Sequence, residues 1–215
     1  MSINDSSLKV KYIEKDFDVA DLDNSAWSSA ETVVIDRHWS GESAPEVRYF
    51  TAKLLWSDEA LYARFEAEQH EPLVVSDTPK LSKKSIGLWD RDVCEIFVAP
   101  DAGQSEKYFE FEVAPTGEWL DVSIEMRPDR RNADWDYRSG MTVATRIETN
   151  KVISAIRIPW SAFDRKPSVG DEWRGNLYRC VGRDPTRGYV AWQPTMTPEP
   201  NFHVPERFGE FLFIS

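Results

Sequence analysis

Carboxylates occur in three neighbouring segments of the chain, 92–99, 107–114 and 119–126, each of which has the alternation of a strand. Side chains two residues apart point to the same face of a β-strand, so the pattern predicts one acidic sheet face. Its members are Glu95, Glu110, Glu112, Asp121 and Glu125. Carboxylates in pairs can hydrolyse glycosides, and they also accept hydrogen bonds from hydroxyl groups or hold a cation. The residue types therefore point to sugar or cation chemistry.

Aromatic residues accompany these acids. Phe97, Tyr108 and Trp119 fall on the same expected face, and Trp89 precedes the first acidic segment. Like charges opposite one another on paired strands destabilise the pair by up to roughly 1 kcal/mol. The face therefore requires countercharges, a cation, a ligand rich in hydroxyls, or solvent exposure. Exposure is the usual state of a charged face, but the aromatic rings favour sugar stacking combined with hydrogen bonds to acids.

The elements that would position these residues are strands. In "ALYARFEAE" (60–68) apolar and polar residues alternate, and short turn sequences separate the other candidates. We expect strands at 47–56, 60–68, 92–99, 107–114, 119–126, 142–149, 152–159, 173–181, 189–193 and 208–214, with one helical turn at 160–165. This spacing predicts an all-β fold, an antiparallel β-sandwich of immunoglobulin-like or jelly-roll-like type or a barrel, in a single domain spanning residues 1–215.

Composition narrows the classes of partner. The net charge of −11 and the pI near 4.8 argue against nucleic acid and anionic membranes. No apolar run reaches the roughly 20 residues of a membrane span, and the first residues lack the apolar core of a signal peptide. The chain as given is therefore expected to be cytoplasmic, or periplasmic or secreted if a leader was removed. Cys94 and Cys180 are expected to be buried, with no zinc motif.

One motif carries a resemblance to a known family. The pattern W-x-x-D-x-x-E-I-F occurs within residues 89–97, and "FHVPERFGEFLF" (202–213) closes the chain. Together with "YFEFEVAPTGEW" (108–119), these segments resemble carbohydrate-binding modules of family 9, within the wider group of DOMON-like β-sandwiches. The similarity extends from about Asp23 to the C-terminus.

The resemblance implies a sandwich that binds a sugar ring between two aromatic side chains. Those positions match Trp89 and Phe202, the second being a tryptophan in characterised members. Glu95 matches the strand acid that bonds sugar hydroxyls, and Glu112 occupies a position that is basic in those members. His203 joins the expected site at its rim. The family also implies calcium as a candidate cofactor, with no ligands assigned in this chain. The expected partner is a mono- or oligosaccharide.

The other tryptophans are expected either at the surface or in the core, according to the residues around them. Trp135 lies in a polar loop, where an exposed ring would lengthen a binding surface. The remaining assigned tryptophans lie in or beside apolar strand patterns and are expected in the core; they are Trp27, Trp56, Trp160, Trp173 and Trp192.

Three other functions stay open. Glu95, Glu110, Glu112 and Asp121 can supply the carboxylate pair of a glycoside-processing enzyme, although no other catalytic signature is present. His203 is the candidate axial ligand for a haem-binding sandwich. Finally, the phenylalanine at 202 favours a module whose sugar site has decayed and which serves a structural or partner-binding role.

Overall fold

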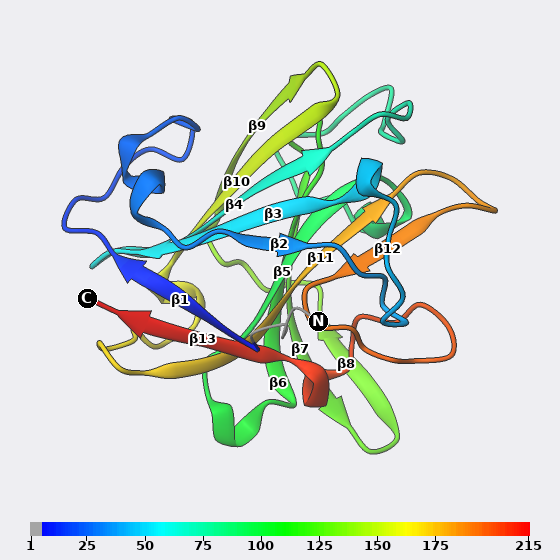
Figure 1. The fold of residues 1–215 in the computed structure, drawn as a ribbon. Helices are drawn as coiled ribbons and strands as arrows, with labels where there is room; N and C mark the ends of the chain where they lie inside the picture. The colour runs from blue at the N-terminus through cyan, green and yellow to red at the C-terminus, as the bar shows by residue number, and fades with distance from the viewer. Residues whose placement is uncertain (1–5) are drawn as a thin grey trace.

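A computed structural model describes residues 6–215, and their regular structure consists of thirteen strands and six single 3-10 turns (Figure 1). The strands are β1 (Ser7–Tyr12), β2 (Val33–Ile35), β3 (Phe50–Trp56), β4 (Ala60–Glu68), β5 (Val93–Ala99), β6 (Lys107–Val113), β7 (Trp119–Arg127), β8 (Arg130–Asp134), β9 (Thr142–Glu148), β10 (Lys151–Pro159), β11 (Glu172–Val181), β12 (Gly188–Ala191) and β13 (Gly209–Ile214). The 3-10 turns are η1 (Ser25–Ser29), η2 (Glu46–Arg48), η3 (Leu88–Asp90), η4 (Ala102–Gln104), η5 (Trp160–Ala162) and η6 (Pro205–Arg207). No helix in the described part of the chain is long and apolar enough to cross a membrane.

All thirteen strands belong to one strongly curled sheet, in which eleven follow the order β8-β7-β6-β5-β11-β13-β1-β3-β4-β10-β9. The other two pair at its side, β12 with β11 and β2 with β3. The curl folds the two halves of this sheet over each other as a sandwich, and the β13–β1 pair connects them (Figure 1). Strand β1 runs parallel to both of its neighbours, β13 and β3. The sandwich is thus confirmed, but the sheet is mixed rather than purely antiparallel, because the first strand inserts between two strands from distant parts of the chain.

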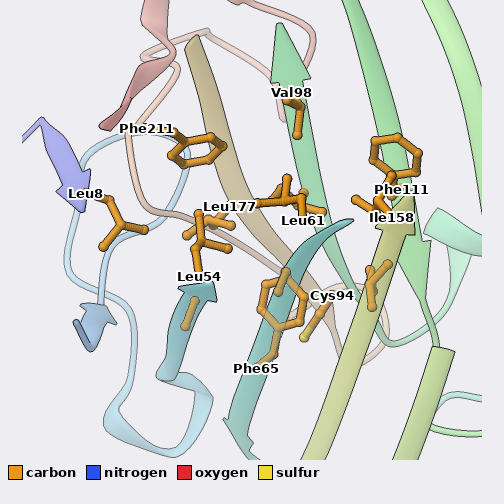
Figure 2. Close-up of a cluster of buried hydrophobic side chains, with 14 of the residues drawn as sticks. Leu8, Leu54, Leu61, Phe65, Cys94, Val98, Phe111, Ile158, Leu177 and Phe211 are labelled. Carbon is orange, nitrogen blue, oxygen red and sulfur yellow. The ribbon is translucent and has the colours of Figure 1, made fainter. Parts of the chain in front are cut away.

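The main hydrophobic core lies between the two halves. Side chains from β3 and β4, such as Leu54 and Leu61, meet Val98, Phe111 and Phe211 from the other half (Figure 2). A second cluster covers the outer face of β5, β6, β7 and β11, and a third covers the outer face of β4 and β10. Both faces of several strands are consequently buried.

The expected strands are all present with small shifts at their ends. The segment beginning at Val47 starts with the turn η2, so its strand begins only at Phe50. Strands β1, β2 and β8 were not expected, and the last of these is important for the site. The five tryptophans assigned to the core are buried, and both cysteines are buried and free, as predicted.

Candidate functional site

Three of the predicted acids meet on the outer face of β5 and β6. The register pairs Glu95 with Glu112 and Phe97 with Glu110, which places the three carboxyls on one face. Glu95 is 1%, Glu110 4% and Glu112 0% exposed, so solvent exposure does not explain this cluster. One carboxylate oxygen from each residue lies within 4.8 Å of the others. We call Glu95, Glu110 and Glu112 the acid trio.

Strand β7 presents the opposite face to the one expected. Asp121 pairs with Phe111 and Trp119 with Val113, so Asp121, Glu125 and Trp119 point away from the acid trio. The face that joins the trio is instead the apolar one, with Leu120, Val122 and Ile124. A shift of one residue in the pairing register turns every side chain of a strand to the other face of the sheet. Strand β7 therefore turns its apolar face toward the trio and its mixed face toward the main core.

Asp121 has a structural partner of its own. It lies 2.5 Å from the Lys84 ammonium and accepts hydrogen bonds of 2.7 Å from both the backbone N–H and the hydroxyl of Ser139. This buried carboxylate therefore anchors the chain segments around residues 84 and 139, and it does not belong to the candidate site.

The acid trio forms no ion pair in the described part of the chain, although the Arg187 and Arg131 guanidinium groups partly offset the rise in the pKa of Glu95 and of Glu110 from a greater distance. Among residues 6–215 no Lys, Arg or His side chain forms an ion pair with any of its members, and the Cys180 thiol, 3.6 Å from Glu95 Oε1, is a neutral neighbour. Burial raises the pKa of Glu112 well above its usual value, and the nearby Glu95 and Glu110 carboxyls raise it further. Burial therefore favours the protonated form of Glu112, whose carboxyl shares a hydrogen bond with that of Glu110.

A cavity of about 270 Å³ opens above the trio. Glu95 and Glu110 contribute to its wall, whereas Glu112 is not among the lining side chains. The other lining residues come from loops and strand ends, and they are Trp89, Asp90, Phe97, Ile124, Arg131, Ala133, Trp135, Cys180, Tyr189, Pro200, Asn201, Phe202 and His203. The cavity therefore combines aromatic walls with an acidic floor.

Trp89 and Trp135 form one aromatic wall. Their ring centroids are 6.0 Å apart with an interplanar angle of 37°, and they are 36% and 37% exposed, so a ligand can still cover both rings. Trp89 lies in the turn η3, which follows Gly87 in a left-handed conformation with φ of +83°. The Arg187 guanidinium donates to the carbonyls of Trp89 and Arg91, each at 2.7 Å, and holds this turn in place.

The motif aspartate supports the same loop from below. Asp92 is 2% exposed and accepts hydrogen bonds from the backbone N–H groups of Val74, at 3.0 Å, and Gly182, at 2.8 Å. Asp92 therefore ties together three segments beneath Trp89. Its contacts are structural and lie outside the cavity.

Phe202 and His203 form another part of the cavity wall. The Phe202 ring stacks on Tyr178 with centroids 4.0 Å apart, and the Tyr178 hydroxyl donates to the Phe202 carbonyl at 3.0 Å. His203 Nδ1 lies 2.8 Å from the Tyr108 hydroxyl. Burial, with a smaller contribution from Arg131, lowers the pKa of His203 to about 3, so its imidazole is neutral.

The structure thus brings together four of the five predicted site residues in one cavity wall and places the fifth, Glu112, directly behind it. It also adds residues that the sequence patterns did not assign, among them Arg131, Tyr189 and Asn201. The signal for Trp135 was its polar loop alone. Strand β8, which precedes it and pairs with β7, is polar and carried no recognisable strand pattern.

The sequence of this protein is similar to a family of carbohydrate-binding domains. Residues 20–214 match the model of the family described as "Carbohydrate family 9 binding domain-like". The chain belongs to this family. As a family 9 carbohydrate-binding domain, it has the sandwich and the motif expected from its sequence. No curated protein matches the chain significantly.

Solved structures share the fold of this family 9 domain over nearly its whole length. A protein of Bacteroides uniformis, solved as a candidate carbohydrate-binding protein, superposes with a TM-score of 0.76 at 17% identity, covering 96% of this chain and 98% of its own. A family 9 module of Caldicellulosiruptor kristjanssonii in complex with cellotriose gives 0.68 at 17% identity, with coverage of 97% and 94%. The same organism's module in complex with glucose gives 0.67 at 18% identity, with coverage of 96% and 95%.

Proposed function

We propose that this protein binds a mono- or oligosaccharide without catalysis, and that one sugar ring lies in the cavity bounded by Trp89, Trp135 and Phe202. The observation that carries the proposal is the partly exposed tryptophan pair in a cavity that buried acids also line. Flat aromatic faces take up the C–H groups of a pyranose, and carboxylates accept hydrogen bonds from its hydroxyls. Membership of the family supports the same function.

The roles of the individual residues follow from their placement. Trp89 and Trp135 act as the stacking platform, and Phe202 contributes a further apolar contact from the cavity wall. Glu95, at the cavity wall, accepts from sugar hydroxyls, and neutral His203 offers a polar contact at the rim. Glu112 has no exposed surface, so we assign it an indirect role in place of the direct acceptor role predicted from the sequence.

Binding is favoured over glycoside hydrolysis by the position of the acids. Hydrolysis requires two carboxyls placed on either side of one glycosidic bond, with room for water. Here the three acids gather at one side of the cavity and Glu112 is sealed from it. This arrangement suits recognition of hydroxyls on one edge of a ring. Structural neighbours solved with glucose and cellotriose make glucose-type sugars the first ligands to test.

The test is a titration of glucose, cellobiose, cellotriose and galactose by isothermal calorimetry, with tryptophan fluorescence as a second readout. We expect at least one sugar to bind in the micromolar to millimolar range. Trp89→Ala should weaken that binding about tenfold, while Trp119→Phe, a change on the opposite sheet face, should leave it unaltered. Unaltered affinity in a folded Trp89→Ala variant would show that the sugar binds elsewhere. Chromatography of the same mixtures should reveal no hydrolysis products.

A further inference from the structure

We infer that the cavity prefers an acidic sugar, and that the Arg131 guanidinium binds the carboxylate of a hexuronic acid. This inference rests on the proposed function and names the class of sugar that the site takes. It is carried by three side chains of the cavity wall that offer hydrogen-bond donors, Arg131, Asn201 and His203. We call these three residues the donor group.

Arg131 supplies a cation that the protein does not use. Strand β8 places Arg131 two residues before Ala133, which also lines the cavity, so both side chains point to the same side of the sheet. Arg131 is exposed, and its guanidinium forms no hydrogen bond or ion pair within residues 6–215. Its charge adds to the effect of burial in lowering the pKa of His203, so it acts on the part of the wall that holds His203.

Asn201 offers its amide N–H groups to the cavity. Its side-chain oxygen accepts a hydrogen bond of 3.0 Å from the backbone N–H of His203. This contact occupies the oxygen and leaves the amide nitrogen without a partner among the described residues. Because Asn201 is exposed and lines the cavity, a ligand can accept from this nitrogen.

His203 adds a further donor. Its Nδ1 lies 2.8 Å from the hydroxyl of Tyr108, and burial raises the pKa of Tyr108, so the hydroxyl keeps its proton. Within the described residues this hydroxyl has no acceptor other than Nδ1. Buried hydroxyls rarely leave their proton unbonded, so Tyr108 donates to Nδ1. The neutral imidazole then carries its own proton on Nε2, which is free to donate.

The chemistry of the donor group favours an anion over a neutral hydroxyl. Its free polar atoms all carry N–H donors, and a carboxylate only accepts hydrogen bonds, whereas a hydroxyl must also donate one. The planar guanidinium fork matches the two oxygens of a carboxylate. Hydrogen bonds between charged partners are also about twice as strong as those between neutral groups.

The acids of the same cavity do not cancel this preference. Burial raises the pKa of Glu95 and of Glu110 and thereby favours their uncharged forms, which can bond sugar hydroxyls without repelling a carboxylate. Asp90, the other acid of the wall, lies in the Trp89 turn and contributes to the raised pKa of Glu112. Arg131 acts instead on Glu110 and on the His203 part of the wall.

Strand β8 connects the donor group with the stacking platform. Trp135 directly follows this strand, so one strand positions both Arg131 and a ring of the platform. A hexuronic acid has the pyranose ring of a hexose and a carboxylate in place of the terminal CH2OH group. Its ring can therefore stack on Trp89 and Trp135 while its carboxylate meets Arg131.

The experiment compares three sugars that share one ring. The full-length protein is titrated by calorimetry at pH 7 with D-glucuronate, with glucose and with D-glucuronamide, the uncharged amide of the same size. We expect glucuronate to bind at least about tenfold more tightly than the other two. About 0.5 M NaCl should reduce this preference, because it screens a charge at an open cavity.

Arg131→Gln should lower the ratio of the glucuronate and glucose affinities to about one. Arg131→Lys keeps the charge without the fork and should retain part of the preference. The matched control is Arg130→Gln, which removes the same charge from the neighbouring residue on the opposite face of β8 and should keep the wild-type ratio. Thermal unfolding verifies that each variant is folded.

The outcomes separate this inference from the proposed function. A preference for glucuronate in the wild type and in Arg130→Gln, but not in Arg131→Gln, supports both. If glucose binds and glucuronate binds no more tightly, the inference is overturned and the proposed function stands. If the preference persists in Arg131→Gln, the carboxylate binds elsewhere and the inference is likewise overturned. If neither the acidic nor the neutral sugars bind, the proposed function fails and the inference fails with it.

Discussion

Replacement of Trp135 by alanine tests whether the two tryptophans act as one platform. A tryptophan presents roughly 150–250 Å² of surface, so an exposed fraction of 37% corresponds to roughly 55–90 Å². At about 25 cal/mol per Å², complete coverage of that area by a ligand is worth about 1.4–2.3 kcal/mol. A sugar covers about half of it, which gives ~1 kcal/mol, or about a fivefold loss of affinity in Trp135→Ala.

A double-mutant cycle with Trp89→Ala makes this prediction sharper. The ring centroids are 6.0 Å apart, so each ring restrains the other, and we expect a coupling energy of about 0.5–1 kcal/mol between the two substitutions. Calorimetry with the best-binding sugar measures all four affinities, and thermal unfolding shows whether the partly exposed rings were removed without loss of the fold. An unchanged affinity in Trp135→Ala, together with a loss in Trp89→Ala, would refute the platform and leave a single stacking residue.

Three further predictions concern stability. Because the pKa of His203 is lowered to about 3, the unfolded chain binds a proton at this residue before the folded protein does, and stability is lost as the pH falls below about 6.5. Between pH 6.5 and 4.5 the free energy of unfolding of the wild type, measured in urea, should fall by about 1–2 kcal/mol more than that of His203→Gln. Parallel pH profiles of the two proteins would contradict this. Asp92→Ala should lower the free energy of unfolding in urea by about 2–4 kcal/mol, because two backbone N–H groups lose their acceptor. A decrease below about 1 kcal/mol would show that water replaces the carboxylate. Gly175→Ala should lower Tm by at least about 10 °C or prevent folding, because the new Cβ would lie 2.1 Å from the Phe211 ring. The control Gly103→Ala, at the surface, should have little effect on Tm. Equal Tm values for Gly175→Ala and the wild type would contradict the close packing.

Much of the fold could be predicted from alternation and turn residues. Strand β4 shows why: Leu61, Ala63 and Phe65 alternate with polar residues, and the strand has the predicted bounds, Ala60–Glu68. The alternation did not predict that the polar face of β4 is also buried. Tyr62, on that face, packs beneath the segment around Trp27. Strand β2 escaped prediction because it is short, and β8 because it is polar. Strand β1 escaped because its main pairing is with β13, at the other end of the chain.

The part of the candidate site that lies within one short segment of the chain could be predicted from the sequence. Trp89 and Glu95 are linked by a motif of nine residues, and both line the cavity. The assignment of Asp121 to this face was wrong because the register between β6 and β7 is set by packing on both sides of the sheet, which the composition of a single strand does not reveal. The burial of Glu112 depends on loops that cover the face from elsewhere in the chain, and no local pattern encodes it.

The supports of the cavity indicate that it is formed before any ligand arrives. The Trp89 turn is held by Arg187 and Asp92, and Phe202 is fixed by ring stacking and a backbone hydrogen bond from Tyr178. The supporting side chains of Arg187, Asp92 and Tyr178 do not line the cavity, so their contacts are already present without a ligand. Little conformational entropy then remains to be lost on binding, which benefits a shallow site with few contacts. Glu95 and Glu110 line this preformed cavity and form no ion pair in the described part of the chain, so a ligand that donates hydrogen bonds to them gains the interaction without the cost of ordering the protein.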